Sequence, residues 1–344
     1  MNLPIPSGPG DLTPDWLSRA LGRITGPLLV TRIGEDEGFT GGALYRVRSG
    51  DGSWVVKLAP ADPAARALFA RANRREVTLY TELGRGLPVP GCAHGAFDAA
   101  TGASVLVLQD LGACRPGDFL AGLSAEQTGA VADALADIHA AWWDAPRAAA
   151  LSGADCLDEF GFVDCWAAYP AKVAGLLPDI ALPPEFRALG DHIAANARAI
   201  FGALMEHGPL TVLHRDCQAD NVMFADDGAA VIYDWQFMGK GRGVWDVAFL
   251  LTSSVAPAVR SRIEDGILRR YHRRLCAAGV NGYGWRQCRR EYRQAWVARL
   301  FVTVVATVLL DNDTAHRRAW RRTDLERLLA FRSDHRLAAA DFPV

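Results

Sequence analysis

The feature that most constrains the fold of this chain is a polar loop set between two short apolar segments. Residues 214–221 read HRDCQADN, the strand-like residues PLTVL at 209–213 precede them, and the apolar residues 222–224 follow at once. A further apolar segment ends just before Asp234. Strand-like residues on both sides indicate a loop held on a rigid hairpin, which keeps the side chains of a site in register. The sequence therefore places one polar β-loop inside a half of the chain whose other patterns are helical.

The side chains of this loop match the needs of phosphoryl transfer. That reaction requires little covalent help from a protein, but the nucleophile and the metal must be held in line. Asp216 can accept the proton of a substrate hydroxyl or orient it, and Asn221 and Asp234 supply the oxygen ligands that Mg²⁺ prefers. Asp and Asn in loops are ordinarily turn formers, as at 226–228, but here three roles occur in one short window. We therefore interpret Asp216 as catalytic and Asn221 and Asp234 as Mg²⁺ ligands.

The first ~110 residues have a β-rich pattern. Segments 28–35, 43–49 and 53–59 predict a three-stranded antiparallel meander, because glycine-rich turns separate them. A helix over 63–83 and two further strands, near 92–97 and 104–108, complete a small α+β unit.

From Ser124 onward the patterns are those of long helices. They cover 124–143, 184–205, 258–277, 285–310 and 316–339. The fold class is therefore α+β, with a small β-rich N-terminal lobe (1–108), a hinge (109–112) and a larger, mainly helical C-terminal lobe (113–344). We expect a ligand to bind in the cleft between the lobes.

Lys57 is the first candidate for binding a nucleotide. It ends an apolar strand, and the chain has only two other lysines. A pair with Glu76, on the following helix, would aim the Lys57 ammonium at the α and β phosphates. A surface lysine at a strand end is the alternative, and Glu82 lies on the same helix as Glu76.

Two further segments complete the expected nucleotide site. Residues 38–42 read GFTGG, so Thr40, Gly41 and Gly42 can donate hydrogen bonds to phosphates, although a hairpin turn is the commoner meaning of such a stretch. Gln109 and Leu111 lie where the backbone of a hinge would read the adenine edge, although any linker would look similar.

Composition excludes several classes of partner. The formal net charge of −2 gives no basic field for nucleic acid or an anionic membrane. The seven scattered cysteines argue against a disulfide framework or a zinc site. The longest uncharged apolar stretch, 300–310, is shorter than the roughly 20 residues of a membrane span, and the N-terminus lacks a signal-peptide pattern. We expect a soluble, cytoplasmic protein.

With these motifs the chain resembles the aminoglycoside phosphotransferase and choline kinase superfamily, and most of all its ecdysteroid kinase-like branch. The matching segments are LVLQDLG at 106–112, ADIHAAWW at 136–143, HRDCQADN at 214–221, IYDWQ at 232–236 and GRGVWDVA at 241–248. The resemblance implies a two-lobed, protein-kinase-like fold, ATP or GTP as phosphate donor, Mg²⁺ and a hydroxylated small-molecule acceptor. Asp246 resembles the family's buried helix-start aspartate, which ties down the catalytic loop. Asp246 and His139 otherwise have structural interpretations.

The short segment between Asp234 and Asp246 indicates the size class of the acceptor. Only eleven residues separate Asp234 from Asp246, too few for the activation segment of a protein kinase, and no APE follows. The resemblance implies that helices within 144–206 and 258–340 form the acceptor pocket, and a bacterial natural-product or antibiotic kinase is the leading interpretation.

Two alternatives come from other functional classes. A nucleotide-binding pseudokinase would lack one of Lys57, Asp216, Asn221 or Asp234, and this chain has all four. A thiol hydrolase would use Cys217 with His214, which lies three residues away on a constrained loop.

Overall fold

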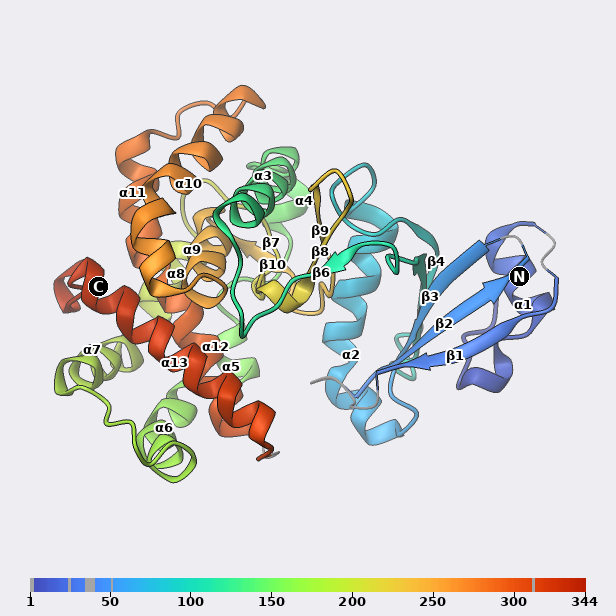
Figure 1. Ribbon diagram of the computed structural model, residues 1–344, viewed down its shortest axis with the longest axis horizontal. Coiled ribbons are helices and arrows are strands. Elements are labelled where there is room, and N and C mark those ends of the chain that lie inside the picture. Colours follow the sequence, from blue (N-terminus) through green and yellow to red (C-terminus); the bar gives the residue numbers. More distant parts are fainter. Residues whose placement is uncertain (1–2, 24–25, 35–40, 51, 311–312) are drawn as a thin grey trace. The chain divides into compact units, whose positions relative to one another are not determined.

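The computed structural model of the protein describes residues 3–23, 26–34, 41–50, 52–310 and 313–344. The chain forms two compact units, Met1–Arg115 with Val231–Met238, and Pro116–Ala230 with Gly239–Val344. The expected α+β class, with a β-rich N-terminal part and a mainly helical C-terminal part, is confirmed (Figure 1). The segment Val231–Met238, which the sequence analysis assigned to the larger lobe, groups with the first unit.

The first unit is built on a five-stranded antiparallel sheet in the order β1-β2-β3-β5-β4. Its strands are β1 (Leu29–Ile33), β2 (Ala43–Ser49), β3 (Gly52–Leu58), β4 (Cys92–Phe97) and β5 (Ser104–Gln109). The meander and the two later strands predicted from the sequence are therefore confirmed. β3 is the central strand, so Lys57 lies opposite Leu44 of β2 and Leu106 of β5.

Helix α1 (Pro14–Leu21) covers one face of this sheet (Figure 1). It begins where the sequence predicts, because the Thr13 side chain caps it by accepting a hydrogen bond from Trp16 N. Trp16 and Leu17 are buried in one apolar cluster with Val47 of β2 and Val56 of β3. This cluster fixes the sheet that carries Lys57.

Helix α2 (Pro63–Thr78) packs on β4 and β5, and a π-helical turn, Leu79–Leu83, continues it. Its N-terminus is capped by the Asp62 side chain, which accepts a hydrogen bond from Ala65 N. Successive side chains of a strand point to opposite faces. Val56 therefore joins the cluster under α1, whereas Lys57 points toward the side on which α2 lies.

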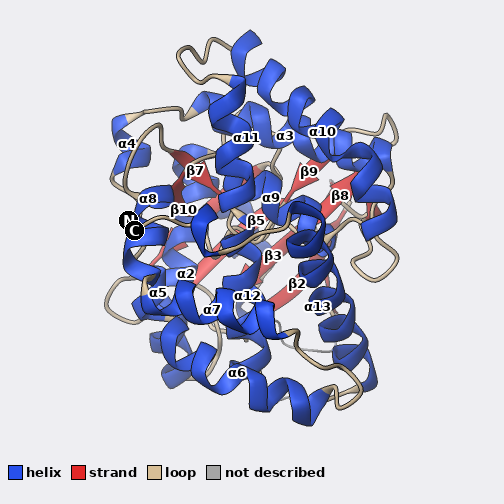
Figure 2. Ribbon diagram, turned by 90° about the vertical axis from the view of Figure 1, so that its left-hand side faces the viewer, coloured by secondary structure: helices blue, strands red, loops and turns tan. Residues whose placement is uncertain are grey.

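The second unit is mainly helical (Figure 2). Its helices are α3 (Ala125–Ala141), α4 (Pro146–Ala149), α5 (Cys156–Glu159), α6 (Phe162–Leu176), α7 (Pro184–Ala195), α8 (Ala197–Met205), α9 (Val244–Ser253), α10 (Pro257–Ala277), α11 (Trp285–Gln294), α12 (Trp296–Leu309) and α13 (Ala315–His335). Its short strands are β7 (Thr211–Leu213), β8 (Val222–Phe224) and β10 (Gly239–Gly241). Two further short strands, β6 (Arg115–Pro116) and β9 (Ala230–Ile232), contain residues of both units. β7 and β10 pair antiparallel, α3 packs on α10, and α12 packs on α6 and α9. In the described part of the chain, no helix combines the length and the apolar character that crossing a membrane requires.

Some helix boundaries differ from the sequence-based expectation. The helix expected over 184–205 is interrupted at Asn196, whose φ of −121° and ψ of 20° are not helical. The helix expected over 285–310 is divided at Ala295 into α11 and α12. Helices α6 and α9 were not predicted as elements. All residues of α9 are buried, so its sequence has no polar face that would reveal a helical period.

Candidate active site

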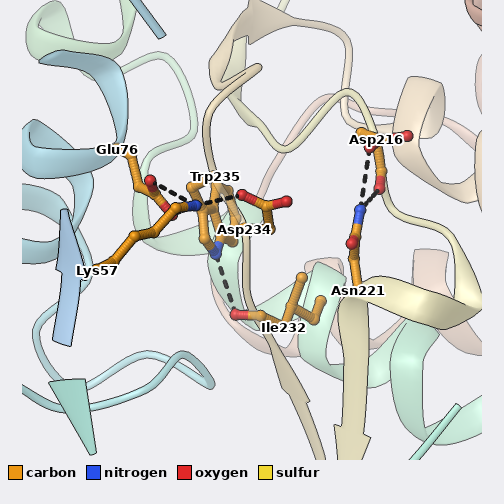
Figure 3. Close-up of polar contacts among 7 residues, drawn as sticks. All are labelled: Lys57, Glu76, Asp216, Asn221, Ile232, Asp234 and Trp235. Carbon is orange, nitrogen blue, oxygen red and sulfur yellow. Dashed lines mark hydrogen bonds and ion pairs between the residues drawn. The ribbon is translucent and has the colours of Figure 1, made fainter. Parts of the chain in front are cut away.

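A cluster of charged side chains in the first unit joins Lys57, Glu76 and Asp234 (Figure 3). Lys57 Nζ lies 2.9 Å from Glu76 Oε1 and 2.8 Å from Asp234 Oδ1. Glu76 is buried near the end of α2, whereas Glu82 is exposed. The Lys57–Glu76 pair expected from the sequence is therefore formed. The contact between Lys57 and Asp234, which are 177 positions apart, was not predicted.

The charges of this cluster determine its protonation. Burial alone would lower the pKa of the Lys57 ammonium, but the charges of Asp234 and Glu76 outweigh burial and raise that pKa. Burial raises the pKa of the Glu76 carboxyl to about 7, against the Lys57 charge, and the Asp234 charge adds to the rise. One ammonium thus faces two carboxylates. Because the Asp234 side chain is 36% exposed, its carboxylate is accessible to a cation from solvent.

Asp234 has an uncommon backbone conformation. Its φ is 63°, in the left-handed region, which costs on the order of 1–3 kcal/mol for a non-glycine residue and is concentrated at functional sites. The fully buried Trp235 follows, and its indole Nε1 donates to Ile232 O at 3.0 Å (Figure 3). Ile232 N in turn donates to Pro88 O at 2.9 Å. These contacts hold Asp234 in place despite its conformation.

The expected phosphate loop is only partly described. Thr40 lies outside the described residues, while Gly41, with φ 64°, and Gly42 lead directly into β2. A positive φ at Gly41 is a conformation that favours glycine. The role of these residues toward phosphates stays a prediction.

The expected hinge begins inside the sheet. Gln109 is the last residue of β5, and its side-chain oxygen accepts a hydrogen bond from Gly91 N at 3.2 Å. Asp110 accepts from Arg46 Nε at 2.8 Å and from Ser53 Oγ at 2.5 Å. Burial opposes the charge of Asp110, but the bonds to Ser53 and Arg46 hold its pKa below the usual range. Asp110 is therefore tied to the sheet, and the reading of a base by Gln109 and Leu111 stays a prediction.

In the second unit, Asp246 anchors the loop 214–221. It lies in the first turn of α9, has no exposed surface, and accepts hydrogen bonds from His214 N at 2.7 Å and Arg215 N at 2.9 Å. The buried His139 places Nε2 at 3.2 Å from the same carboxylate and Nδ1 at 2.8 Å from Tyr271 Oη. Asp246 and His139 thus have the structural positions that the sequence indicated.

Asp216 and Asn221 contact one another within this loop. Asn221 Nδ2 donates to Asp216 O at 2.8 Å and to Asp216 Oδ2 at 3.0 Å (Figure 3). Asp216 N donates to His214 Nδ1 at 3.1 Å, so the buried imidazole also holds the aspartate. The carboxylate is half-buried and oriented by its neighbours. Because Asn221 binds Asp216 through the amide nitrogen, its amide oxygen is not used in this contact.

Arg215 has a role that the sequence analysis missed. It is buried, has a φ of 69°, and donates from Nη2 to the carbonyl oxygens of Ser152 at 2.5 Å and of Gly153 and Lys240 at 3.0 Å. A guanidinium has five N–H donors in one plane, which suits it to several carbonyls at once. Arg215 therefore fixes the loop to β10 and to the segment before α5.

Cys217 does not have the surroundings of a nucleophile. It is fully buried, and burial, with the charges of Asp246 and Asp216, raises the pKa of its thiol well above the usual value. His214 Nδ1 is occupied by Asp216 N. The contacts therefore argue against the thiol hydrolase considered from the sequence.

Two of the residues predicted to bind Mg²⁺, one in each unit, carry oxygen atoms of the type that this cation prefers. Asn221 offers an amide oxygen and Asp234 a partly exposed carboxylate, which are ligand types of Mg²⁺. Within the described ranges, no three His, Cys, Asp or Glu side chains gather as a metal site.

The chain is similar to known phosphotransferases in sequence family and in fold. The family model described as "Phosphotransferase enzyme family" matches residues 40–290. Choline kinase from Streptococcus pneumoniae has a TM-score of 0.54 at 14% identity, covering 89% of this chain and 94% of the other. A choline/ethanolamine kinase family protein from Mesorhizobium loti has a TM-score of 0.50 at 18% identity, with coverage of 95% and 98%. A spectinomycin phosphotransferase solved with ADP and spectinomycin has a TM-score of 0.50 at 13% identity, with coverage of 94% and 98%. No curated protein sequence matches significantly.

Proposed function

The chain belongs to the phosphotransferase enzyme family, and on this premise we propose that it transfers the γ-phosphate of ATP or GTP to a hydroxyl of a small molecule. The observation that carries the proposal is the hydrogen bond between Asn221 and Asp216 in a loop that Asp246 anchors. Phosphoryl transfer depends mainly on positioning and on charge stabilisation, and a loop fixed before the substrate arrives supplies the first of these.

Asp216 is the proposed catalytic residue. Its carboxylate accepts the proton of the acceptor hydroxyl, or orients that hydroxyl toward the phosphorus. Asn221 Nδ2 and His214 Nδ1 hold the side chain and the backbone of Asp216, so the residue keeps one orientation. Removal of the Asp216 carboxylate should therefore lower the rate of transfer far more than the affinity for nucleotide.

Lys57, Glu76 and Asp234 are proposed to serve the nucleotide. Glu76 orients the Lys57 ammonium, which contacts the α and β phosphates. Asn221 and Asp234 would hold Mg²⁺, which when bound neutralises charge on the phosphates. Backbone and hydroxyl donors of Thr40, Gly41 and Gly42 are proposed to bind the phosphates, and Gln109 and Leu111 to contact the base.

The acceptor is proposed to be a hydroxylated small metabolite or an antibiotic-like natural product, and the chain to lie in the ecdysteroid kinase-like branch. Support for a compact acceptor comes from the eleven residues between Asp234 and Asp246, and from the spectinomycin bound by one enzyme of similar fold. The cysteines are free thiols, which supports the further proposal that the protein acts in the cytoplasm.

A screen for nucleoside diphosphate release tests the function. Aminoglycosides, other hydroxylated antibiotics, amino alcohols, sugars, nucleosides and sterols are offered with ATP and with GTP in the presence of Mg²⁺. Mass spectrometry then identifies the acceptor that has gained one phosphoryl group. Asp216→Ala is expected to lower kcat by roughly 10²-fold or more while nucleotide still binds.

A matched variant makes this test specific. Asp226 is exposed on the turn between β8 and β9, so Asp226→Ala should turn over like the wild type. Turnover of Asp216→Ala near the wild-type rate would contradict the mechanism. Nucleotide binding by the wild type without transfer to any acceptor would favour the pseudokinase.

A further inference from the structure

The segment 117–123 lies directly on the second half of the catalytic loop, inside the second unit. Phe119 N donates to Asp220 Oδ1 at 2.9 Å, and Gly117 N donates to Val222 O at 2.9 Å. A Cβ atom added at Gly117 would lie 2.2 Å from Ala219 O, so the two backbones are already in close contact. Any displacement of this segment is therefore passed to the residues that flank Asn221.

Phe119 is the fixed point of the segment. Its side chain is 1% exposed, and its ring stacks on Trp320 with a centroid distance of 4.9 Å. The guanidinium carbons of Arg327 and Arg299 lie 5.0 Å and 5.6 Å from the centre of the same ring. Cation–π contacts of this kind are strongest where water is excluded.

Arg327, on α13, joins this segment to the end of α9. Its side chain is buried, and Nη1 donates to Phe119 O at 2.7 Å and to Ser253 O at 2.5 Å. The next residue, Ser254, accepts a hydrogen bond from Ala219 N at its Oγ (2.8 Å) and from Leu123 N at its carbonyl oxygen (2.7 Å). One buried guanidinium therefore lies where the catalytic loop, the segment 117–123 and α9 meet.

We propose that Arg327 is a positioning residue for phosphoryl transfer, acting through Phe119 and Asp220 on the catalytic loop. The inference rests on the proposed function of that loop. Lysine does not replace this arginine, because an ammonium lacks the second nitrogen, Nη2, which donates to Leu120 O at 3.3 Å, and lacks the planar cation that lies over the Phe119 ring. Arg327 binds the carbonyl of Phe119, and Phe119 N binds Asp220, so the effect of Arg327 on the loop passes through the backbone of the segment.

A double-mutant cycle tests this route. Arg327→Lys and Asp220→Ala are each expected to lower kcat on the order of 10-fold to 100-fold, with the KM of the acceptor little changed. Their combination should be no worse than the more severe single variant, because both act through the same link. Asp220→Asn keeps an oxygen for Phe119 N and should recover most of the activity. Arg322→Lys on the same helix is the control, since Arg322 is an exposed partner of Asp179.

Hydrogen exchange gives a second measurement that does not need turnover. Amides of Phe119 and Ala219 should exchange faster in Arg327→Lys than in the wild type or Arg322→Lys, under conditions in which all three are folded. If Arg327→Lys does not fold, Phe119→Leu replaces it, because leucine keeps the backbone bonds and loses the ring contacts.

The outcomes separate this inference from the proposed function. The positioning role would be overturned if the losses of kcat in Arg327→Lys and Asp220→Ala multiply in the double variant. It would also be overturned if the amides of Phe119 and Ala219 exchange at the wild-type rate in Arg327→Lys. A wild-type protein that transfers phosphate to no acceptor would refute the proposed function, while the exchange experiment would still decide whether Arg327 holds the loop.

Discussion

Replacing Asp246 with asparagine should separate the anchoring of the catalytic loop from its chemistry. The Asp246 carboxylate has no solvent exposure and accepts hydrogen bonds from the backbone N–H groups of His214 and Arg215, one on each oxygen. An asparagine offers only one oxygen. Whichever way the amide turns, one of the two backbone N–H groups then faces an NH₂ group instead of an acceptor.

The size of the effect follows from these contacts. A hydrogen bond to a charged group contributes about 1.5–3 kcal/mol, and a buried donor left unpaired costs about 1–3 kcal/mol more. Asp246→Asn should therefore lower the free energy of unfolding by about 3–5 kcal/mol, a large part of the roughly 5–15 kcal/mol that a folded domain has. The loop that carries Asp216 would also lose its fixed position, so kcat should fall even where the variant is folded.

Urea unfolding measures this loss, with Asp226→Asn on the exposed turn as the control. The midpoint of Asp246→Asn should shift to lower urea while the slope stays the same. A loss of stability below about 1 kcal/mol would refute the reasoning, because it would mean that Asp246 is not needed to satisfy the buried N–H groups of His214 and Arg215.

Three further perturbations test other parts of the site. Lys57→Met should lower kcat/KM for the nucleotide by roughly 10²-fold or more, whereas Lys172→Met should not. Steady-state kinetics with varied nucleotide measure both variants, and an equal loss of kcat/KM in the two would mean that Lys57 has no special role. The pKa of Glu76 rises from 4.5 to about 7 in the folded protein. Protonation of Glu76 therefore stabilises the fold by at most about 3 kcal/mol, an effect that is fully present below about pH 4.5 and is lost as the pH rises through about 7. Urea titrations in metal-free buffer should show this fall with pH, and Glu76→Gln should remove it; a wild-type protein without the fall would contradict the raised pKa. Gly117→Ala should lower kcat and stability, because its Cβ would meet Ala219 O at 2.2 Å, and a variant with unchanged kinetics and unfolding would show that the backbone there yields easily.

The sequence predicted those elements whose apolar residues repeat with a clear period. Strands β2, β3 and β5 were placed correctly because short segments rich in apolar and β-branched residues lie between turn residues. α9 was missed as an element, since a helix that is buried on all sides has no polar face, and only the resemblance indicated a helix start at Asp246. The break at Ala295 was missed because alanine favours a helix and the interruption depends on tertiary packing.

The candidate site was predictable where one short segment carries it. Residues 214–221 supplied Asp216 and Asn221 together, and the helix that follows β3 supplied Glu76 for Lys57. The contact between Lys57 and Asp234, and the bonds of Arg327, join residues that are far apart in the chain and have no local pattern in common. Such contacts follow from the packing of whole elements, so one sequence alone did not show them.

The loop is held by side chains that bind the main chain, and this decides which positions matter. Asp246 accepts from two backbone N–H groups, Arg215 donates to the carbonyls of Ser152, Gly153 and Lys240, and Arg327 donates to those of Phe119 and Ser253. A backbone group is present whatever the side chain, so a partner such as Ser152 can change its side chain without losing the bond. The anchoring side chain cannot change in this way, because its charge and geometry make the contact. Substitutions at Asp246, Arg215 and Arg327 should therefore disturb the loop much more than a substitution at a partner such as Ser152, which contributes only its carbonyl oxygen to the bond with Arg215.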